Sequence, residues 1–183
     1  MIVEIQQATT EQKPVVKWLL ELYLEEMCQM KGGRVPSKEV FLDDEYLNLF
    51  WTIPGWHAFL IHFHKQVAGF LLVNTDGYLR PGSGVKAIPE IFVLRRYRRQ
   101  GIGKSAAFQI FDRFPGKWEV LESDFNALGQ TFWRRVISEY TGGVYSEGIL
   151  DSQVWQGPVQ SFDSKEIIRP SVQAEETPGE EEK

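Results

Sequence analysis

Apolar residues recur along the chain with two periods, and each period predicts one type of element. A spacing of three and four positions predicts helices over 15–30, 101–114 and 126–140, and a shorter helix that follows Asp43 or Asp44. Shorter apolar runs between turn residues predict strands. Those strands cover 2–7, 57–63, 66–73, 85–94, 118–121, 144–149 and 153–162.

The resulting order is β-α-α-β-β-β-α-β-α-β-β, which predicts an α/β fold of the α+β type with one mixed, twisted sheet and helices on both faces. The segments 85–94, 101–114 and 118–121 form a βαβ unit, for which a right-handed crossover is expected. Pro89 lacks an amide donor, so strand pairing should be interrupted near it.

The length of 183 residues fits one domain, which we assign to residues 1–163. Residues 164–183 differ in character, because six glutamates lie there, five of them from Glu175 onward, among proline and glycine with few apolar side chains. This composition predicts a disordered, acidic tail.

Composition argues against several classes of protein. The net charge of −5 disfavours nucleic-acid binding, no apolar run is long enough to span a membrane, and the first residues do not resemble a signal peptide. We therefore expect a cytoplasmic protein. Cys28 is the single cysteine, and the spacing of His62 and His64 is better explained by an exposed strand end than by a metal site, so no metal is expected.

The segment from Glu90 to Lys104 carries the strongest chemical signal. A predicted strand leads into a basic turn that contains Gly101 and Gly103 and opens a helix. Exposed amides and the helix dipole favour an anion at such a helix start, and glycine lets a phosphate approach closely. Four arginines and Lys104 add positive charge, so we predict a pyrophosphate site.

Two other phosphate motifs fit this turn less well. Gly103-Lys104-Ser105 has the ending of a Walker loop, but no glycine lies five positions before Gly103. Gly101, Gly103 and Ala106 loosely match a dinucleotide fingerprint, with Glu119 and Glu122 near the expected acidic position. A nucleotide-phosphate binder therefore stays open as an alternative.

The turn resembles the cofactor motif of the GNAT superfamily of N-acetyltransferases, Gln/Arg-x-x-Gly-x-Gly/Ala. It reads Arg98-Arg99-Gln100-Gly101-Ile102-Gly103 here, and the preceding Glu90-Ile91-Phe92-Val93 resembles the strand that leads into it in that family. The predicted order of elements is also similar, from residue 2 to about 162.

The resemblance implies acetyl-CoA as co-substrate and a central sheet that splays beside the acetyl group. Main-chain amides of the turn would bind the pyrophosphate, and the end of the preceding strand would hydrogen-bond the pantetheine arm. The implied cofactor-binding residues are Val93, Leu94, Arg98, Arg99, Gln100, Gly101, Ile102, Gly103, Lys104, Asn126 and Trp133.

Asn126 and Trp133 come from a second similarity, to the family pattern Asn-x-x-Ala-x-x-Phe-Tyr. Here Gly129 replaces the alanine and Trp133 replaces the tyrosine that serves as an acid. Indole does not act as an acid in this pH range. Trp133 is therefore expected to pack either on the cofactor or in the core, while Tyr140 and Tyr145 are alternative acids that spacing does not distinguish.

The implied reaction is direct attack of a primary amine, from a small molecule or peptide, on the thioester. Glu90 is the candidate catalytic base, because it lies on the strand beside the expected acetyl group. An acidic and aromatic rim on the first two helices would suit a cationic amine. This rim comprises Glu21, Glu25, Glu26, Asp43, Asp44, Glu45, Tyr23, Tyr46, Trp51 and Trp56.

A non-catalytic acyl-CoA-binding or regulatory module is the alternative from a different functional class, and the tryptophan at position 133 is its main support. The sequence does not identify the acceptor, and it leaves the oligomeric state, including a homodimer, open.

Overall fold

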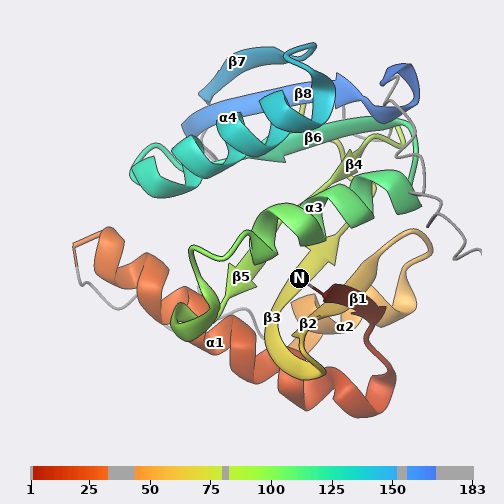
Figure 1. Cartoon of the computed structure of the whole chain (residues 1–183), viewed down its shortest axis with the longest axis vertical. Coiled ribbons are helices and arrows are strands. Elements are labelled where there is room, and N and C mark those ends of the chain that lie inside the picture. Colours follow the sequence, from red (N-terminus) through yellow and green to blue (C-terminus); the bar gives the residue numbers. More distant parts are fainter. Residues whose placement is uncertain (1, 33–43, 80–82, 152–155, 168–183) are drawn as a thin grey trace, which may run out of the picture.

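The computed structural model describes residues 2–32, 44–79, 83–151 and 156–167 (Figure 1). Within these ranges the chain forms four α-helices, eight strands and three short 3-10 turns. The α-helices are α1 (Lys13–Met30), α2 (Asp44–Thr52), α3 (Ile102–Arg113) and α4 (Ala127–Thr141). The strands are β1 (Val3–Gln7), β2 (His57–Phe63), β3 (Gln66–Val73), β4 (Lys86–Ala87), β5 (Ile91–Val93), β6 (Lys117–Leu121), β7 (Ser146–Asp151) and β8 (Gln156–Asp163). The 3-10 turns are η1 (Thr10–Gln12), η3 (Arg95–Tyr97) and η4 (Ser164–Glu166).

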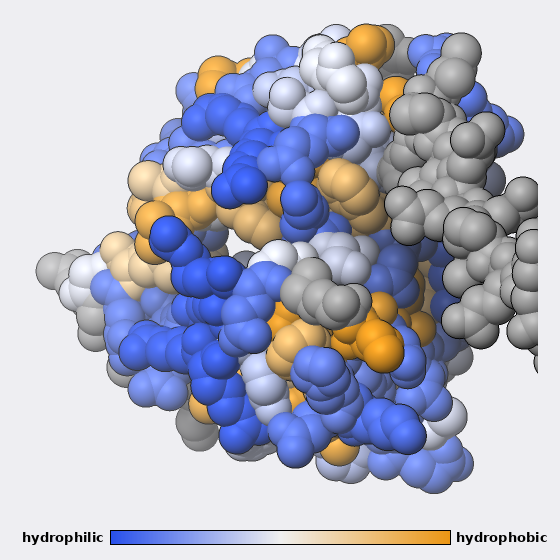
Figure 2. Space-filling model, in the orientation of Figure 1, coloured by the Kyte–Doolittle hydropathy of each residue, from blue (hydrophilic) through white to orange (hydrophobic). Residues whose placement is uncertain are grey.

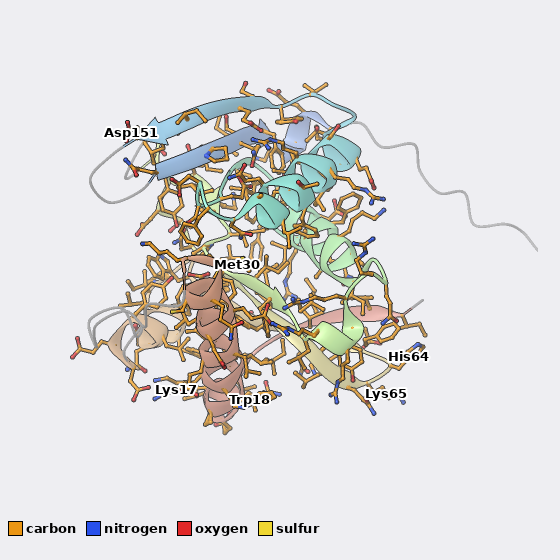
Figure 3. The ribbon with its side chains drawn as sticks, turned by 90° about the vertical axis from the view of Figure 1, so that its left-hand side faces the viewer. Lys17, Trp18, Met30, His64, Lys65 and Asp151 are labelled. Atoms are coloured by element: carbon orange, nitrogen blue, oxygen red, sulfur yellow. The ribbon has the colours of Figure 1, made fainter. Side chains whose placement is uncertain are left out.

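The first sheet has the strand order β1-β2-β3-β5, and every pair in it is antiparallel. The hairpin between β2 and β3 turns at His64 and Lys65, whose φ angles of 48° and 64° are typical of a two-residue hairpin turn. Figure 3 shows both residues at the outer end of this hairpin. β5 is an edge strand of this sheet.

Both faces of the first sheet are buried, because successive strand residues point to opposite sides. Phe59, Ile61 and Leu71 face the core beneath α3, while Leu60 and Phe70 face the core beneath α1 and α2. Helices therefore cover both faces, as the hydrophobic pattern predicts.

The second sheet has the order β4-β6-β8-β7. β4 and β6 are parallel and the other pairs are antiparallel, so β4, α3 and β6 form the predicted βαβ unit. The helix α4 packs on this sheet through Trp133, Val136 and Ile137, and α3 lies between α4 and the first sheet (Figure 1).

The prediction of one mixed sheet and one strand over 85–94 is corrected by the structure. This segment contributes β4 to one sheet and β5 to the other, and Pro89 lies between them. The two sheets are also linked where Asn74 and Ala87 exchange main-chain hydrogen bonds of 3.0 Å. Pro89 thus interrupts pairing as expected, and the interruption divides the sheet.

The described chain continues beyond the predicted domain end at residue 163. The turn η4 follows β8, and Ile167 packs against the core. The rest of the predicted acidic tail and the predicted Asp43 cap lie outside the described residues. Among the helices that are described, none is both long and apolar enough to cross a membrane.

Candidate active site

The turn before α3 presents main-chain amides without a side-chain cap. Gly101 is the N-cap of α3 with φ of 76°, and Arg99 has φ of 63°. The first amides of an α-helix lack intrahelical acceptors, so those of Ile102, Gly103 and Lys104 are available to an anion. The predicted glycine turn and helix start are therefore present, and the Ile102 side chain is buried, which leaves its amide as the group available to a ligand.

Gly103 lets α3 pack closely against its neighbours. A methyl group on Gly103 would lie 3.2 Å from Cζ of Phe132 and 3.7 Å from Cγ2 of Val93. Phe132 of α4 therefore packs beside the turn. No role was predicted for Phe132 from the sequence, although it directly precedes Trp133 in the second motif.

The open edge of β5 exposes the amide of Val93. The Leu94 amide donates to the Ala68 carbonyl and the Leu72 amide donates to the Glu90 carbonyl, both at 2.9 Å. Main-chain groups alternate in direction along an antiparallel strand, so the Val93 amide points away from β3. It lies on the edge where the two sheets separate.

Leu94 differs from Val93 in this respect. Its amide is bonded to Ala68, and its carbonyl accepts a hydrogen bond of 2.8 Å from the Tyr97 amide. Val93 and Leu94 were both expected to contact a pantetheine arm through the main chain. The Val93 amide is free of β3 and can make such a contact, whereas the amide and the carbonyl of Leu94 are both bonded within the fold.

The basic residues of the turn are not equivalent. Arg95 and Arg98 both pair with Glu26 of α1, at 3.0 Å and 2.9 Å, and Arg98 Nε also donates to the Val93 carbonyl at 2.7 Å. Lys104 pairs with Glu139 of α4 at 2.8 Å. Glu26 and Glu139 therefore neutralise part of the positive charge that the sequence predicted for the turn.

Arg96 and Arg99 are exposed, and neither forms an ion pair with any residue that the structure describes. Gln100 is also exposed, and its side-chain amide donates to the Arg96 carbonyl at 3.3 Å. These exposed groups surround the glycine turn, while Arg98 holds the turn against α1.

Glu90 directly precedes β5 and faces the side of the sheet covered by α1 and α2. The residue as a whole is half-buried, but its atom Oε2 is buried and has no hydrogen-bond partner among the described residues. Burial raises the pKa of Glu90 to about 7, and a hydrogen bond from the Tyr23 hydroxyl opposes this rise. A carboxyl group with this pKa can exchange a proton near neutral pH.

Two further tyrosines surround Glu90. Burial raises the pKa of Tyr46 in α2, and that of Tyr78 to about 12, and the negative charge of Glu90 contributes to both shifts. Tyr23 and Tyr46 belong to the predicted aromatic rim, whereas Tyr78 was not predicted from the sequence. Its segment follows β3 and is held by Glu119, whose carboxylate accepts the Tyr78 and Leu79 amides at 2.6 Å and 3.0 Å.

The rest of the predicted acidic and aromatic rim does not gather at Glu90. Asp44 pairs with Lys17 at 2.8 Å, while the Trp51 indole donates to the Ala8 carbonyl at 2.9 Å. Trp56 is buried, and Glu21 and Glu25 are exposed on α1. The positions of these rim residues on the first two helices did not indicate which helix faces would lie next to Glu90.

Asn126 caps α4, because its side chain accepts the Gly129 amide at 2.9 Å. A Cβ atom at Gly129 would overlap the Asn126 side-chain amide, which explains glycine in place of the family's alanine. Met27 of α1 lies 4.0 Å from this amide, so α1 reaches the start of α4. Figure 3 shows α1 running from Trp18 to Met30, toward the half of the molecule that contains α4.

Trp133 has only 5% of its surface exposed and packs against Phe111 and Phe132 in the core. This position agrees with the core alternative considered for it and places it away from solvent. Tyr140 is also buried, and its hydroxyl donates to Asp112 at 2.9 Å. The structure therefore gives Tyr140 a structural role within the core.

The two halves of the molecule leave an opening between them. Figure 2 shows this opening, with the surface over α4 on one side and the surface over β5 and the start of α3 on the other. The glycine turn and α3 lie on one side of the first sheet, and Glu90 lies on the side covered by α1 and α2. No cluster of three or more metal-ligating side chains occurs in the described ranges.

The Acetyltransferase (GNAT) family profile matches residues 18–128. The chain belongs to the GNAT acetyltransferase family. The match covers most of α1, the glycine turn and the start of α4, and thus includes the residues that carry the site described above. No curated protein matches the chain in a comparison of sequences.

Solved structures share the fold at low sequence identity. An acetyltransferase from Thermus thermophilus is 12% identical, with a TM-score of 0.65, over 89% of this chain and 97% of its own. PaiA N-acetyltransferase from Thermoplasma acidophilum, in complex with coenzyme A, is 12% identical with a TM-score of 0.58, over 89% and 99%. The aminoglycoside acetyltransferase AAC(6')-Ib, also in complex with coenzyme A, is 13% identical with a TM-score of 0.62, over 90% and 96%.

Proposed function

We propose that this protein is an acetyl-CoA-dependent N-acetyltransferase that acetylates a primary amine of a small molecule or peptide by direct attack. The observation that carries the proposal is the position of Glu90 immediately before β5. It places a buried carboxyl of near-neutral pKa three residues before the Val93 amide on the open sheet edge. The glycine turn follows within eight residues.

Each group has a distinct task in this proposal. The amides at the start of α3 bind the pyrophosphate, with Arg99, Gln100 and Arg96 beside it, and Arg98 and Lys104 hold the turn through their ion pairs. The Val93 amide donates to the arm or to the thioester carbonyl, where it polarises the bond. Two similar structures that hold coenzyme A support this choice of co-substrate.

Glu90 acts as the base. Its carboxylate removes one proton from the acceptor's ammonium, directly or through one water, and the neutral amine then forms the C–N bond. The C–S bond breaks, and its electron pair leaves with the sulfur as the coenzyme A thiolate. The second amine proton is released to the thiolate or to solvent. Because thiols have pKa values near 8.5, the thiolate leaves without a strong acid.

Ligand-dependent thermal unfolding tests the co-substrate. Acetyl-CoA at 100 times its dissociation constant should stabilise the protein by about 2.7 kcal/mol. Coenzyme A should act similarly, and ATP and NAD should have smaller effects. A larger shift with ATP or NAD would instead support the nucleotide-phosphate alternative.

The pH dependence of thiol release then tests the base. A panel of primary amines would be screened for release of coenzyme A, and kcat/KM for an active amine should rise through about pH 7 as Glu90 loses its proton. Glu90→Gln should lower kcat at least 100-fold while acetyl-CoA still stabilises the variant. An unchanged rate in Glu90→Gln would remove Glu90 from the mechanism.

A non-catalytic acyl-CoA-binding module is the second candidate. It is favoured by Trp133, which replaces the family's tyrosine and lies in the core. Its expected result is acetyl-CoA binding without thiol release for any amine. Turnover that depends on Glu90 would exclude it.

A further inference from the structure

Three buried oxygen atoms in the second sheet lack a hydrogen-bond donor. They are both carboxyl oxygens of Glu122 and Oε1 of Gln160, and no residue that the structure describes donates to any of them. Only 3% of Glu122 is exposed, and Gln160 is fully buried. Unpaired buried acceptors are costly and uncommon, and a proton on Glu122 would turn one of these acceptors into a donor for another.

The strand register makes Glu122 and Gln160 neighbours. Val120 of β6 lies opposite Gln160 of β8, and the Glu122 amide donates to the Pro158 carbonyl of β8 at 3.2 Å. Residues two apart on a strand share a face, so Glu122 and Gln160 are diagonal neighbours on the face where Val120 packs in the core beneath α4. Figure 1 shows α4 lying across β6 and β8.

Glu147 of β7 sets the orientation of the Gln160 amide. Nε2 of Gln160 donates to Oε2 of Glu147 at 2.7 Å, and Arg134 of α4 donates to the same carboxylate at 2.8, 2.9 and 3.1 Å. The Arg134 contacts, and then the Gln160 contact, hold the pKa of Glu147 below its usual value. An ionised carboxylate only accepts hydrogen bonds, so Gln160 turns its nitrogen toward Glu147 and its oxygen away. That oxygen then needs a donor, which a protonated Glu122 supplies.

The surroundings of Glu122 favour its protonated form near neutral pH. Burial raises the pKa of Glu122 to about 8; the Gln160 side chain opposes this rise, Glu147 adds to it and Arg134 opposes it. Among the described residues packed against Glu122, the charged groups are therefore Glu147 on β7 and Arg134 on α4, while β8 contributes the uncharged Gln160. Arg134 is already paired with Glu147, so an ionised Glu122 would have no cation of its own.

We propose that Glu122 and Gln160 form a proton-controlled switch, in which the proton on Glu122 decides which carboxyl group the Gln160 amide holds. With the proton in place, Glu122 donates to Oε1 of Gln160, and Nε2 of Gln160 donates to Glu147. When this proton leaves to solvent, the Gln160 amide turns over and donates to Glu122. Rising pH thus releases the side-chain link between β8 and β7. The switch goes beyond the proposed acetyl transfer and does not depend on it.

The test is an NMR titration of the unsubstituted protein, labelled with carbon-13 and nitrogen-15, from about pH 6 to about pH 9.5. The Glu122 carboxyl carbon and the Gln160 side-chain amide should titrate together, with one midpoint near pH 8. Cross peaks of the amide protons should pass from the Glu147 side chain to the Glu122 side chain. A Glu122 carboxyl already ionised at about pH 6, or a Gln160 amide that stays in place while Glu122 titrates, would overturn the proposal.

Glu122→Gln should fix the arrangement that the wild type has at low pH, because a side-chain amide at position 122 can donate to Oε1 of Gln160 at every pH. The Gln160 resonances should then stay at their low-pH positions, and the same variant assigns the Glu122 resonance. Asp124→Asn is the matched control, since it removes an exposed carboxylate two residues away and should keep the wild-type midpoint. A Gln160 titration that persists in Glu122→Gln, or that disappears in Asp124→Asn, would also contradict the switch.

Discussion

At the scale of single residues, glycine positions at the site are set by backbone geometry. Gly101 has a positive φ of 76° at the start of α3, a conformation that costs residues with a Cβ atom roughly 1–2 kcal/mol. Gly69 has a different constraint, since a Cβ atom there would overlap the Phe92 carbonyl oxygen of β5. The first glycine shapes the turn, and the second allows β5 to approach β3.

Gly101→Ala should lower the free energy of unfolding by roughly 1–2 kcal/mol and also weaken acetyl-CoA binding, because the turn amides shift. Thermal unfolding with and without acetyl-CoA measures both effects. Gly142→Ala is the control, since Gly142 has φ of 63° at the end of α4 and an added Cβ atom there would meet no neighbouring atoms. It should lose similar stability but keep the acetyl-CoA shift. Equal acetyl-CoA shifts in the two variants would contradict the assignment of the turn.

Glu122 is a second buried carboxyl, at the end of β6. Both of its oxygens and Oε1 of Gln160 are buried without hydrogen-bond partners among the described residues. Burial raises the pKa of Glu122 to about 8. A carboxyl whose pKa is higher in the folded state binds its proton more tightly there, so stability should fall as pH rises from about 4.5 to about 8.

Glu122→Gln should therefore raise the free energy of unfolding at pH 8.5, by roughly 1–3 kcal/mol, and should have little effect near pH 4.5. Urea unfolding at the two pH values measures this difference. Glu119→Gln is the matched control on the same strand: its carboxylate accepts two main-chain amides, so the substitution should destabilise the protein. A loss of stability in Glu122→Gln at pH 8.5 would contradict the assignment of an unpaired, buried carboxyl.

At the scale of elements, α1 links the surroundings of Glu90 to the glycine turn. Tyr23 contacts Glu90, Glu26 pairs with Arg95 and Arg98 of the turn, and Met27 lies beside the Asn126 cap of α4. These residues lie on one face of the helix, because positions three and four apart are neighbours on a helix surface. The helix that carries Tyr23 therefore also supports the turn.

Glu26→Gln should weaken acetyl-CoA binding about twofold to fivefold, since Arg98 would lose the partner that holds it beside the Val93 carbonyl. Titration calorimetry with acetyl-CoA measures the affinity. Lys17→Gln breaks a different ion pair of α1, with Asp44, and should leave the affinity at its wild-type value. Equal affinities in all three proteins would show that the Glu26 pairs do not support the turn.

At the scale of the whole molecule, the division into two sheets produces the open strand edge on which the proposed site depends. Within the described residues, the sheets are linked through the segment 86–93 and the Asn74–Ala87 bridge, and they separate beyond it. The separation leaves β5 with an unpaired edge, and another strand could pair with such an edge. In the proposed function, an extended co-substrate arm would bind the main-chain groups on this edge, such as the Val93 amide.

Hydrogen exchange should report this change across the molecule. In the absence of ligand, the Val93 amide and the amides of 102–104 should exchange quickly, because they lack main-chain acceptors. Acetyl-CoA should slow their exchange, while the β2–β3 amides stay unchanged. Mass spectrometry of exchanged peptides measures this pattern. Protection confined to other segments would contradict the proposed path of the co-substrate.

Local patterns in the sequence were sufficient to predict the elements and the turn. The period of apolar residues indicated the helices and strands to within a few positions, except over 85–94, where the structure has two short strands in place of one. The glycines with adjacent arginines indicated a turn that begins a helix. These features are local, since periodicity and turn chemistry act over a few residues. Pro89 likewise predicted a break in pairing, because a missing amide donor has the same effect in any sheet.

The packing of distant segments determines which of these residues work together. The sequence did not indicate that Pro89 divides the sheet in two, that Glu26 neutralises two arginines of the turn, or that Tyr78 joins Tyr23 and Tyr46 at Glu90. It also could not decide whether Trp133 faces the core or a ligand. Burial, pKa and pairing depend on residues far apart in the chain, and their approach is set by how helices and sheets pack and not by local pattern.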